Sequence, residues 1–503
     1  MQTLHQPRDI AAWLRSSVTG VLQCDSRRLQ PGDGFVAWPG AASDGRRFVG
    51  SALAQGAAAA LVEQAGVQAF ALDDARVCAV PGLKALAGAV ASAYCDDPSQ
   101  ALDVLAITGT NGKTSCAWWT AQLLSVCARP CAVVGTLGMG QPGSVMVPTG
   151  LTTPDPVMLQ QQLRCFVDEG LKACAIEASS IGLVEGRLNA TQVRVAVFTN
   201  FTQDHLDFHG SMENYWAAKD ALFDWPGLAS AVVNTDDARG LQLAARLDRP
   251  GLDLWTVGLE SPARLNAVDI EFTHAGMAWS VVERDAHGVE RERHALQVPL
   301  VGRYNVSNLL CVIASARALG VSLQQAVKAC SALTPVPGRM EQAEAATPDQ
   351  PLVLVDYAHS PDALEKALHA LQPLAARRGG ALWVVVGCGG DRDAGKRPLM
   401  AAVAEREAAR TVLTSDNPRS EDPVHILGQM VAGLTNPGAA LVEPDRAQAI
   451  ALVVSRAEPA DVVLIAGKGH EAYQDIQGVK TPFSDRVHAR QALARRAGSG
   501  VHA

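Results

Sequence analysis

The sequence predicts an α/β protein with parallel sheets. Short runs rich in Val, Ile, Leu and Ala recur between amphipathic stretches, and polar clusters follow most of these runs. Runs that are apolar on both faces and are separated by helices are typical of parallel strands. Open α/β sheets bind their ligands at the carboxyl ends of such strands. The expected strands begin at residues 102, 131, 173, 193, 230, 352, 382, 411 and 462.

Length and composition predict three domains. A chain of 503 residues with 48% hydrophobic content exceeds what one ordinary core accommodates. We expect a first domain over residues 1–100, a second over 101–335 and a third over 336–503, with turn signals near both boundaries. Alternation of apolar and polar residues between about 250 and 300 predicts antiparallel strands inserted in the second domain.

Charge and hydropathy exclude several classes of protein. The balance of 43 Lys and Arg against 51 Asp and Glu gives a net charge of -8, which offers no chain-wide attraction for nucleic acid or an anionic membrane. No uncharged apolar stretch reaches the roughly 20 residues of a membrane span. Eleven cysteines without a C-x-x-C pair indicate a reducing compartment rather than a disulfide framework. We therefore expect a cytoplasmic, monomeric protein that acts on small molecules.

A glycine-rich loop predicts an ATP site. The strand expected at 102–108 runs into this loop, and a helix follows over 115–126. Gly109 and Gly112 allow a tight turn whose N–H groups face an anion. Lys113 would neutralise the β- and γ-phosphates, and the Thr114 hydroxyl would bind Mg²⁺. The complete candidate loop is Gly109, Thr110, Asn111, Gly112, Lys113, Thr114 and Ser115.

The loop is shorter than the usual G-x-x-x-x-G-K-[ST] motif and resembles that of the Mur ligases and the related folylpolyglutamate synthetases. Both families couple ATP cleavage to amide formation. Further motifs extend the resemblance to the Mur ligases from Asp25 to about Arg486. It implies a three-domain Mur ligase architecture, with a central P-loop ATPase-like parallel sheet and a Rossmann-like carboxyl-terminal domain.

Two clusters at strand ends are candidates for a metal site. Glu177 suits Mg²⁺, whereas His205 on its own chemistry is better explained as structural. The pattern D-H-L-D-x-H-G around His205 resembles the one that Mur ligases place beside their second metal ion. The same resemblance matches Lys219 to the lysine that CO2 carbamylates; otherwise Lys219 would be a solvated helix lysine. The implied metal ligands are Thr114, Glu177, His205 and carbamylated Lys219, and the implied catalytic residues are Lys113, Glu177, His205 and Lys219.

The resemblance also assigns nucleotide contacts on both sides of the expected domain boundary. Asn305 and Asn308 match the asparagine pair that Mur ligases present to adenine, although asparagine is equally an ordinary helix cap. Arg339 follows the proline-rich break and matches an arginine that reaches the nucleotide. Asp356 begins a D-Y-A-H-x-P motif whose aspartate meets the nucleotide. A site shared across the boundary suggests that domain closure completes it.

The tetrapeptide Asp416, Asn417, Pro418, Arg419 is the most informative about the amino-acid substrate. Arginine can hold a carboxylate through two parallel hydrogen bonds, which fits an amino acid with an extra distal carboxylate. A surface turn is the alternative. The tetrapeptide resembles the motif of the Mur ligases that add diaminopimelate, whereas those that add L-lysine usually lack this arginine. The diaminopimelate-binding residues that the resemblance implies are Arg392, Asp416, Asn417, Pro418, Arg419, Gly467 and Glu471.

The remaining substrate positions follow from the same resemblance. It implies a uridine-binding first domain and a pair of threonines that hold a muramoyl peptide. Ile181 stands where a histidine is common, and Glu185 stands where a glutamine is frequent. The implied residues that bind UDP-N-acetylmuramoyl-dipeptide are Cys24, Ser26, Ala41, Ala42, Ser43, Thr152, Thr153, Ser179, Glu185 and Arg187.

The implied reaction is ATP-dependent addition of meso-diaminopimelate to the D-glutamate of UDP-N-acetylmuramoyl-L-alanyl-D-glutamate, through an acyl phosphate, in peptidoglycan synthesis. ATP, Mg²⁺ and CO2 are the implied cofactors. The alternatives are an L-lysine-adding Mur ligase, a folylpolyglutamate synthetase and a nucleotide-gated regulatory protein. Arg419 and the first domain argue against the first two. The set of Lys113, Glu177, His205 and Lys219 argues against the third. His359 is a candidate base for the attacking amine.

Overall fold

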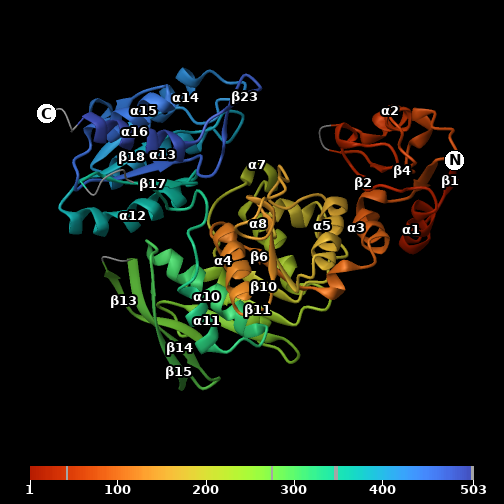
Figure 1. Cartoon of the computed structure of the whole chain (residues 1–503), viewed down its shortest axis with the longest axis horizontal. Helices are drawn as coiled ribbons and strands as arrows, with labels where there is room; N and C mark the ends of the chain where they lie inside the picture. Colours follow the sequence, from red (N-terminus) through yellow and green to blue (C-terminus); the bar gives the residue numbers. More distant parts are fainter. Residues whose placement is uncertain (41–42, 274–275, 345–348, 500–503) are drawn as a thin grey trace.

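The computed structural model describes residues 1–40, 43–273, 276–344 and 349–499. In these ranges three large sheets follow one another along the chain, and each is flanked by helices (Figure 1). The predicted α/β class is confirmed. The boundaries predicted near residues 100 and 335 stay proposals. In the same ranges, no helix has both the length and the apolar character needed to cross a membrane.

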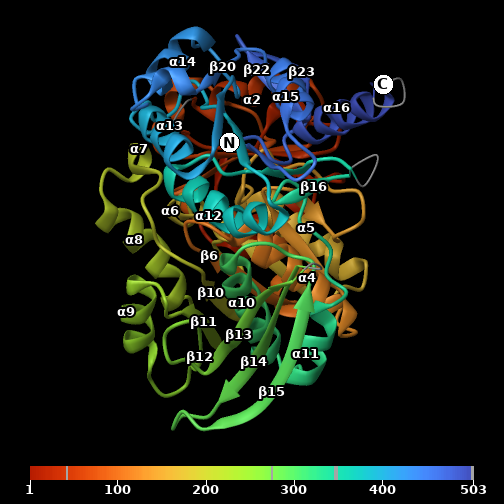
Figure 2. The same cartoon turned by 90° about the vertical axis from the view of Figure 1, so that its left-hand side faces the viewer.

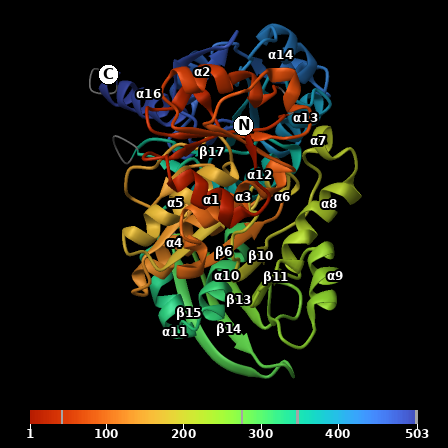
Figure 3. The ribbon, with the colours of Figure 1, turned by 90° about the vertical axis from the view of Figure 1, so that its right-hand side faces the viewer.

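The first sheet has five parallel strands in the order β1-β5-β4-β3-β2. It docks on the central domain through α3 and α5, which lie side by side in Figure 1. Figure 3 shows the molecule with this first domain towards the viewer. The Gln161 side chain of α5 pairs with both backbone groups of Leu22, at 2.9 and 2.8 Å. The elements of this domain are β1 (Gln2–Thr3), α1 (Pro7–Arg15), β2 (Leu22–Gln23), β3 (Gly34–Ala37), α2 (Val49–Ala54), β4 (Ala59–Glu63), β5 (Val77–Val80) and α3 (Leu83–Tyr94).

The central sheet has ten strands in the order β15-β14-β13-β12-β11-β10-β6-β9-β7-β8. Its strands are β6 (Asp103–Thr108), β7 (Cys131–Gly135), β8 (Gly138–Gly140), β9 (Ala173–Glu177), β10 (Val195–Phe198), β11 (Ser230–Asn234), β12 (Asp253–Gly258), β13 (Leu265–Thr273), β14 (Gly276–Arg284) and β15 (Glu290–Val298). Its helices are α4 (Lys113–Val126), α5 (Pro156–Asp168), α6 (Ser180–Val184), α7 (Leu206–His209), α8 (Met212–Asp220), α9 (Ala238–Leu247), α10 (Arg303–Ala318) and α11 (Leu323–Cys330).

The predicted antiparallel insertion is right in part. β13, β14 and β15 are antiparallel to one another. However, β12 is parallel to β11, and β13 pairs with β12 in parallel, so these strands continue the central sheet. Figure 2 shows them reaching away from the third domain. Alternation in the sequence reveals that one face of a strand is exposed, but not which strand it pairs with.

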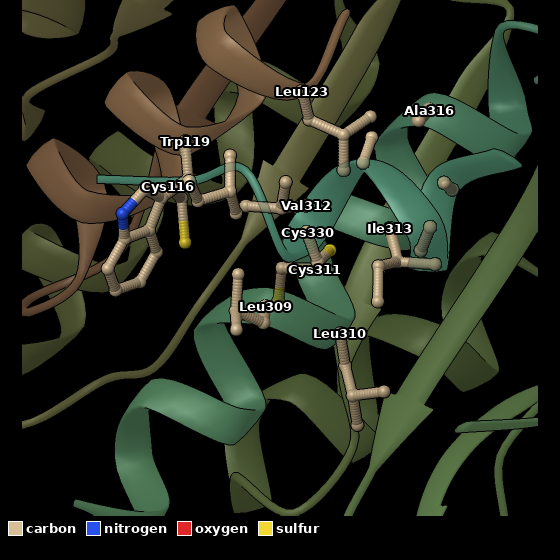
Figure 4. Packing of buried hydrophobic residues seen from close by; sticks show 14 of the residues in the cluster. Cys116, Trp119, Leu123, Leu309, Leu310, Cys311, Val312, Ile313, Ala316 and Cys330 are labelled. Atoms are coloured by element: carbon tan, nitrogen blue, oxygen red, sulfur yellow. The ribbon is translucent and has the colours of Figure 1, made fainter. Parts of the chain in front are cut away.

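Two helices with few exposed residues fix the nucleotide side of the central domain. Cys116, Trp119 and Leu123 of α4 pack towards Leu309 and Val312 of α10 (Figure 4). Most side chains of both helices are buried, so the helices lie in a core rather than at a surface. The loop that precedes α4 and the first turns of α10 are therefore held on a rigid support.

The third sheet has six strands in the order β16-β17-β21-β18-β19-β20, all parallel except β16. A separate hairpin, β22–β23, follows β21. The elements are β16 (Glu341–Ala343), β17 (Leu352–Asp356), α12 (Pro361–Arg378), β18 (Leu382–Val386), α13 (Lys396–Glu407), β19 (Arg410–Leu413), α14 (Pro423–Val431), β20 (Leu441–Val442), α15 (Arg446–Arg456), β21 (Val462–Ala466), β22 (Tyr473–Ile476), β23 (Val479–Pro482) and α16 (Asp485–Ser499).

A buried ion pair supports the carboxyl ends of two strands in this sheet. Arg446 and Asp485 have no exposed side-chain surface, and Arg446 Nε lies 2.7 Å from Asp485 Oδ1. The same guanidinium donates to the carbonyl of Ser415, after β19, at 3.2 Å, and to that of Ala466, at the end of β21, at 2.9 Å. Arg446 therefore holds in place the first residues of the two loops that carry the predicted amino-acid site.

Candidate active site

The loop after β6 has the conformation that only glycine adopts easily. Gly109 and Gly112 have φ values of 142° and 86°. A Cβ atom would lie 1.9 Å from Thr199 Oγ1 at Gly109 and 2.5 Å from Asn308 Oδ1 at Gly112. α4 starts directly after Gly112, so its free N–H groups face the loop. The loop and the helix terminus together form a site for an anion.

Lys113 lies within this loop. Its Nζ donates to the carbonyls of Gly109 and Thr110, each at 2.8 Å. Burial lowers the pKa of the Lys113 amine. These two hydrogen bonds hold the amine beside the helix terminus, where a protonated Lys113 would balance the charge of a phosphate.

Thr114 and Glu177 form an oxygen-rich pair next to the loop. Glu177 is 1% exposed at the end of β9. Its Oε2 accepts from Thr114 Oγ1 at 2.9 Å, and its Oε1 accepts from the backbone N of Thr136 at 2.8 Å. A carboxylate and a hydroxyl are the hard ligands that Mg²⁺ prefers, so this part of the donor set fits the predicted metal.

Lys219 is 1% exposed on α8 and donates from Nζ to the carbonyl of Gly109 at 2.8 Å. Burial, reinforced by the neighbouring Lys113 charge, holds the pKa of Lys219 well below its usual value. Its ammonium form does not fit a metal ion, whereas a carbamate on the same nitrogen would supply oxygen ligands.

His205 precedes α7 in the left-handed region, with a φ of 52°. Its side chain is 42% exposed, and its Nε2 lies 3.6 Å from Asp204 Oδ2. Burial lowers the pKa of His205, although Asp204 opposes this shift. A neutral imidazole can bind a metal ion. Because Mg²⁺ prefers oxygen ligands, however, His205 fits the predicted ligand set less well than Glu177 does.

Asn305 and Asn308 lie beside the phosphate loop. Asn308 Nδ2 donates to Asn305 Oδ1 at 3.2 Å, and Asn305 Nδ2 donates to the carbonyl of Val301 at 2.8 Å. The residue that caps α10 is Gly302, without a side-chain cap. The alternative of ordinary helix-capping asparagines is therefore wrong.

Residues of the third domain reach the phosphate loop. Arg339 Nη2 donates to Thr114 Oγ1 at 3.1 Å, and its guanidinium lies over the Tyr357 ring at 4.5 Å. Asp356 accepts from the backbone N of Met340 at 2.8 Å, and burial raises the pKa of this carboxyl. The predicted convergence of both domains on one site agrees with these contacts.

Two further residues lie at this junction without a role assigned to them from the sequence. Asp362 Oδ2 accepts from Asn111 Nδ2 at 3.0 Å and from Thr202 Oγ1 at 3.2 Å. Asp204 is the second: its carboxylate interacts electrostatically with His359 of the third domain. Asp362 follows Pro361 in the first turn of α12, where acidic residues are common, so its sequence context carried no special signal.

The tetrapeptide after β19 is packed against the loop after β21. Asn417 Oδ1 accepts from Lys468 Nζ at 2.9 Å and from the backbone N of Asp475 at 3.0 Å, while its Nδ2 donates to Glu471 Oε2 at 2.7 Å. Asp416 and Asn417 are 8% and 2% exposed. The alternative of a loose surface turn is therefore wrong. Lys468 was missed, although it lies in the cluster 466–471.

Arg419 follows the buried part of this turn with a φ of 51°. Its Nη1 donates to the carbonyl of Gly390 at 2.6 Å, and its backbone N donates to Asp475 O at 2.9 Å. Pro418 is buried, and its carbonyl lies where a Cβ on Gly390 would clash. The other predicted residues lie around it: Arg392 is exposed, and Gly467 has a φ of 114° with its Cα facing Asp416.

The threonine pair lies next to Glu177. Thr153 is fully buried and donates from Oγ1 to the carbonyl of Glu177 at 2.7 Å, with Ser179 Oγ at 2.9 Å. Arg187 Nη1 donates to Thr153 O at 3.1 Å, and burial lowers the pKa of Arg187. Thr152 Oγ1 accepts from Thr136 at 3.2 Å. These residues therefore share a network with the predicted metal site.

The predicted uridine residues lie in the first domain. Ser26 starts a single 3₁₀ turn capped by Asp25. Cys24 packs against a core cluster that includes Val157 at the start of α5. Burial and the nearby Asp155 raise the pKa of its thiol. Ser43 is exposed. Ala41 and Ala42 lie outside the described residues.

Glu185 connects the first two domains. Its Oε2 lies 2.7 Å from Lys84 Nζ of α3. Glu185 stands where Mur ligases often have a glutamine, and its carboxylate pairs with a lysine of the first domain.

Fold and site together define a class of protein: a three-domain α/β enzyme that holds a phosphate group on its central sheet, between two domains that carry further binding residues. Models of the Mur ligase family match in all three domains. The Mur ligase family catalytic domain matches residues 19–94, the Mur ligase middle domain 107–316, and the Mur ligase glutamate ligase domain 338–469. The chain belongs to the Mur ligase family.

Two similar proteins carry the same name. A UDP-N-acetylmuramoyl-L-alanyl-D-glutamate--2,6-diaminopimelate ligase from Acidovorax sp. (strain JS42) is 57% identical and covers 99% of both chains. One of the same name from Janthinobacterium sp. (strain Marseille) is 46% identical over 98% of both chains. The predicted family and the predicted class of enzyme, a ligase, are confirmed.

Solved structures agree with the fold. A structure of a UDP-N-acetylmuramoyl-L-alanyl-D-glutamate--2,6-diaminopimelate ligase superposes with a TM-score of 0.63, at 36% identity and 95% coverage of both chains. The MurF ligase from Thermotoga maritima in complex with ADP gives a TM-score of 0.67 at 17% identity, over 96% of this chain and 99% of that one. At that identity the second likeness bears on the fold alone.

Proposed function

We propose that the protein joins meso-diaminopimelate to the D-glutamate of UDP-N-acetylmuramoyl-L-alanyl-D-glutamate, with cleavage of ATP to ADP and phosphate. One observation carries the proposal most directly. The anion site on α4 lies between a threonine network at Glu177 and a third domain whose Arg339 bonds to Thr114. An enzyme that forms an amide from a carboxylate and an amine with ATP needs these three ligands to converge.

The phosphate loop would hold the triphosphate. The N–H groups at the start of α4 and the amine of Lys113, which lies against the loop, would face the β- and γ-phosphates. Arg339 lies beside Thr114 and adds a second cation from the third domain. The adenine ring of ATP would lie near Asn308, whose side chain is next to Gly112. Charge that develops on the transferred phosphoryl group is thus met by groups already in place.

Mg²⁺ would be held by Thr114, Glu177, His205 and a carbamate on Lys219. The ion would supply positive charge between the substrate carboxylate and the γ-phosphate, two anions that otherwise repel each other. Lys219 would need CO2, because only the carbamate turns this buried amine into an oxygen ligand. Glu177, already held by Thr136, orients its second oxygen towards Thr114.

The residues around Glu177 would hold the acceptor peptide. Thr153, Ser179 and Arg187 form a connected network at the metal site. The first domain would bind the uridine end through Cys24, Ser26, Ala41, Ala42 and Ser43. The γ-carboxylate of D-glutamate would attack the γ-phosphate, whose bond to the β-phosphate oxygen breaks, to give an acyl phosphate and ADP. The amine of diaminopimelate would then attack the acyl carbon, lose a proton and displace phosphate.

The third domain would bind diaminopimelate. Arg419 and Arg392 provide guanidinium groups for its distal carboxylate, and Asp416 and Glu471 provide carboxylates for the ammonium beside it. L-Lysine has this ammonium but lacks the carboxylate. Selectivity for diaminopimelate would therefore depend on the arginines.

The test is ADP release by the purified protein with Mg²⁺-ATP and the UDP-muramoyl dipeptide, with either meso-diaminopimelate or L-lysine. We expect turnover with meso-diaminopimelate and at least about a tenfold loss in Arg419→Ala, since a hydrogen bond to a charged group contributes about 1.5–3 kcal/mol. Arg410→Ala, an exposed arginine at the start of β19, is the matched control. Equal use of L-lysine, or no turnover with either amine, contradicts the proposal.

A further inference from the structure

Lys468 is a buried cation in the loop after β21 that the proposed chemistry does not use. Its side chain has no exposed surface. A buried ammonium group is costly unless polar groups surround it. Its Nζ donates to Asn417 Oδ1 and to Glu471 Oε2, each at 2.9 Å, and lies 3.9 Å from Asp416 Oδ1. All three partners belong to the predicted diaminopimelate site.

Lys468 determines which way the Asn417 amide points. Asn417 Oδ1 receives hydrogen bonds from Lys468 Nζ and from the backbone N of Asp475. If the amide were flipped, its NH₂ group would face both of these donors. Asn417 Nδ2 is therefore turned to Glu471 Oε2, which it meets at 2.7 Å.

The same contacts orient Glu471. Its Oε2 accepts from two donors, Lys468 Nζ and Asn417 Nδ2. Among the described residues no hydrogen-bond partner reaches its Oε1, and the side chain is 18% exposed. One oxygen of Glu471 is thus fixed inside the protein, and the other is left to accept from a bound ligand.

We infer that Lys468 is a positioning residue that makes the site selective for an amino acid with an ammonium group at its far end. It locks Asn417 and Glu471 so that Glu471 Oε1 meets the ammonium of the diaminopimelate centre that does not react. This inference rests on the proposed function. Arg419 binds the far carboxylate of diaminopimelate, and Glu471, which Lys468 positions, binds the far ammonium.

Two amine substrates separate this role from general support of the fold. L-2-Aminopimelate has the reacting amine and both carboxylates of diaminopimelate but lacks the far ammonium. In Lys468→Met, we expect kcat/KM for meso-diaminopimelate to fall at least about tenfold, because Glu471 loses its fixed orientation. With L-2-aminopimelate, kcat/KM should change less than about threefold, and KM for ATP should stay unchanged.

Lys480→Met is the matched control. Lys480 is an exposed lysine of β23, and its Nζ lies 4.4 Å from the centre of the Tyr473 ring, which is also 5.7 Å from Lys468 Nζ. The same substitution close to the same ring should leave the preference for diaminopimelate at the wild-type value.

Asn417→Asp provides a second variant in case Lys468→Met does not fold. It keeps a partner for the buried ammonium but removes the NH₂ that binds Glu471, so the same loss of preference is expected. An equal loss with both amines, or an unchanged preference in Asn417→Asp and Lys468→Met, overturns the inference. Failure of the wild-type protein to use diaminopimelate is a different result, because it removes the proposed function itself.

Discussion

Asn111 of the phosphate loop donates a hydrogen bond from its amide nitrogen to the carboxylate of Asp362 at the start of α12, over 3.0 Å. Thr202 donates to the same oxygen at 3.2 Å, and Lys366 lies 2.9 Å from the other. Asp362 therefore ties the central domain to the third domain directly at the loop that would hold ATP. A contact of this kind can couple nucleotide binding to the position of the amine substrate.

Asp362→Ala should separate nucleotide binding from catalysis. The substitution removes the hydrogen bonds that Asn111 and Thr202 of the central domain donate to Asp362. A hydrogen bond to a charged group contributes about 1.5–3 kcal/mol. We expect kcat to fall about tenfold or more, whereas the Kd for ATP changes less than about threefold. Calorimetry and ADP release measure the two quantities.

Glu365→Ala is the control for this prediction. Glu365 lies one turn further along α12 and pairs with Arg406 inside the third domain. Its loss should leave kcat unchanged. A wild-type kcat in Asp362→Ala would show that the contact does not serve catalysis.

The sequence was sufficient for the parallel strands and the phosphate loop because their signals are local. An apolar run such as 462–466 predicts a buried strand, and Gly109 and Gly112 predict a tight turn from their own conformational freedom. Asp362 and Lys468 could not be recognised in this way. Asp362 bonds to a residue 251 positions away, and Lys468 bonds to one 51 positions away. Their roles depend on tertiary packing, and an isolated Asp or Lys is ordinarily a solvated residue.

Lys219 should carry a carbamate in solution. Burial and the Lys113 charge lower its pKa, so more of its amine is neutral near pH 7 than for an exposed lysine, and the neutral amine is the form that reacts with CO2. With carbon-13-labelled bicarbonate, we expect a carbamate carbonyl signal by NMR that is missing from Lys219→Arg. Turnover of that variant should fall by about two orders of magnitude or more, since a metal ligand supports several kcal/mol of charge stabilisation.

Lys328→Arg, at an exposed position of α11, is the control and should keep both the signal and the activity. A labelled carbamate that persists in Lys219→Arg would assign the modification to another residue.

His359 should make the third domain less stable in mild acid. Burial lowers the pKa of His359 to about 4, and the Lys396 charge acts in the same direction. An unfolded histidine titrates near about 6.5, so between these pH values the unfolded chain binds more protons than the folded one. This contribution to stability is complete above the unfolded pKa and is lost as the pH falls towards 4.

Urea denaturation at pH 7 and pH 5 measures this effect. His359→Gln should lose less free energy of unfolding between the two pH values than the wild type does. His287→Gln, at an exposed turn position, should follow the wild type. Equal losses in all three proteins would contradict the assignment to His359.

Burial, rather than distance, should decide how much an ion pair stabilises this protein. Arg446–Asp485 and Arg264–Asp253 have the same N···O distance of 2.7 Å, but the side chains of the first pair are 0% exposed and those of the second are 34% and 47% exposed. Removing one partner of a buried pair leaves an uncompensated charge, which costs about 3–5 kcal/mol, whereas exposed pairs contribute about 0–1 kcal/mol. Asp485→Asn should therefore lower the free energy of unfolding by about 3 kcal/mol or more, and Asp253→Asn by less than about 1 kcal/mol. The double variant Arg446→Met with Asp485→Leu should recover part of this lost stability, because it removes both charges together. If the double variant is no more stable than Asp485→Asn, the hydrogen bonds of Arg446 to Ser415 and Ala466 matter more than the charge pair.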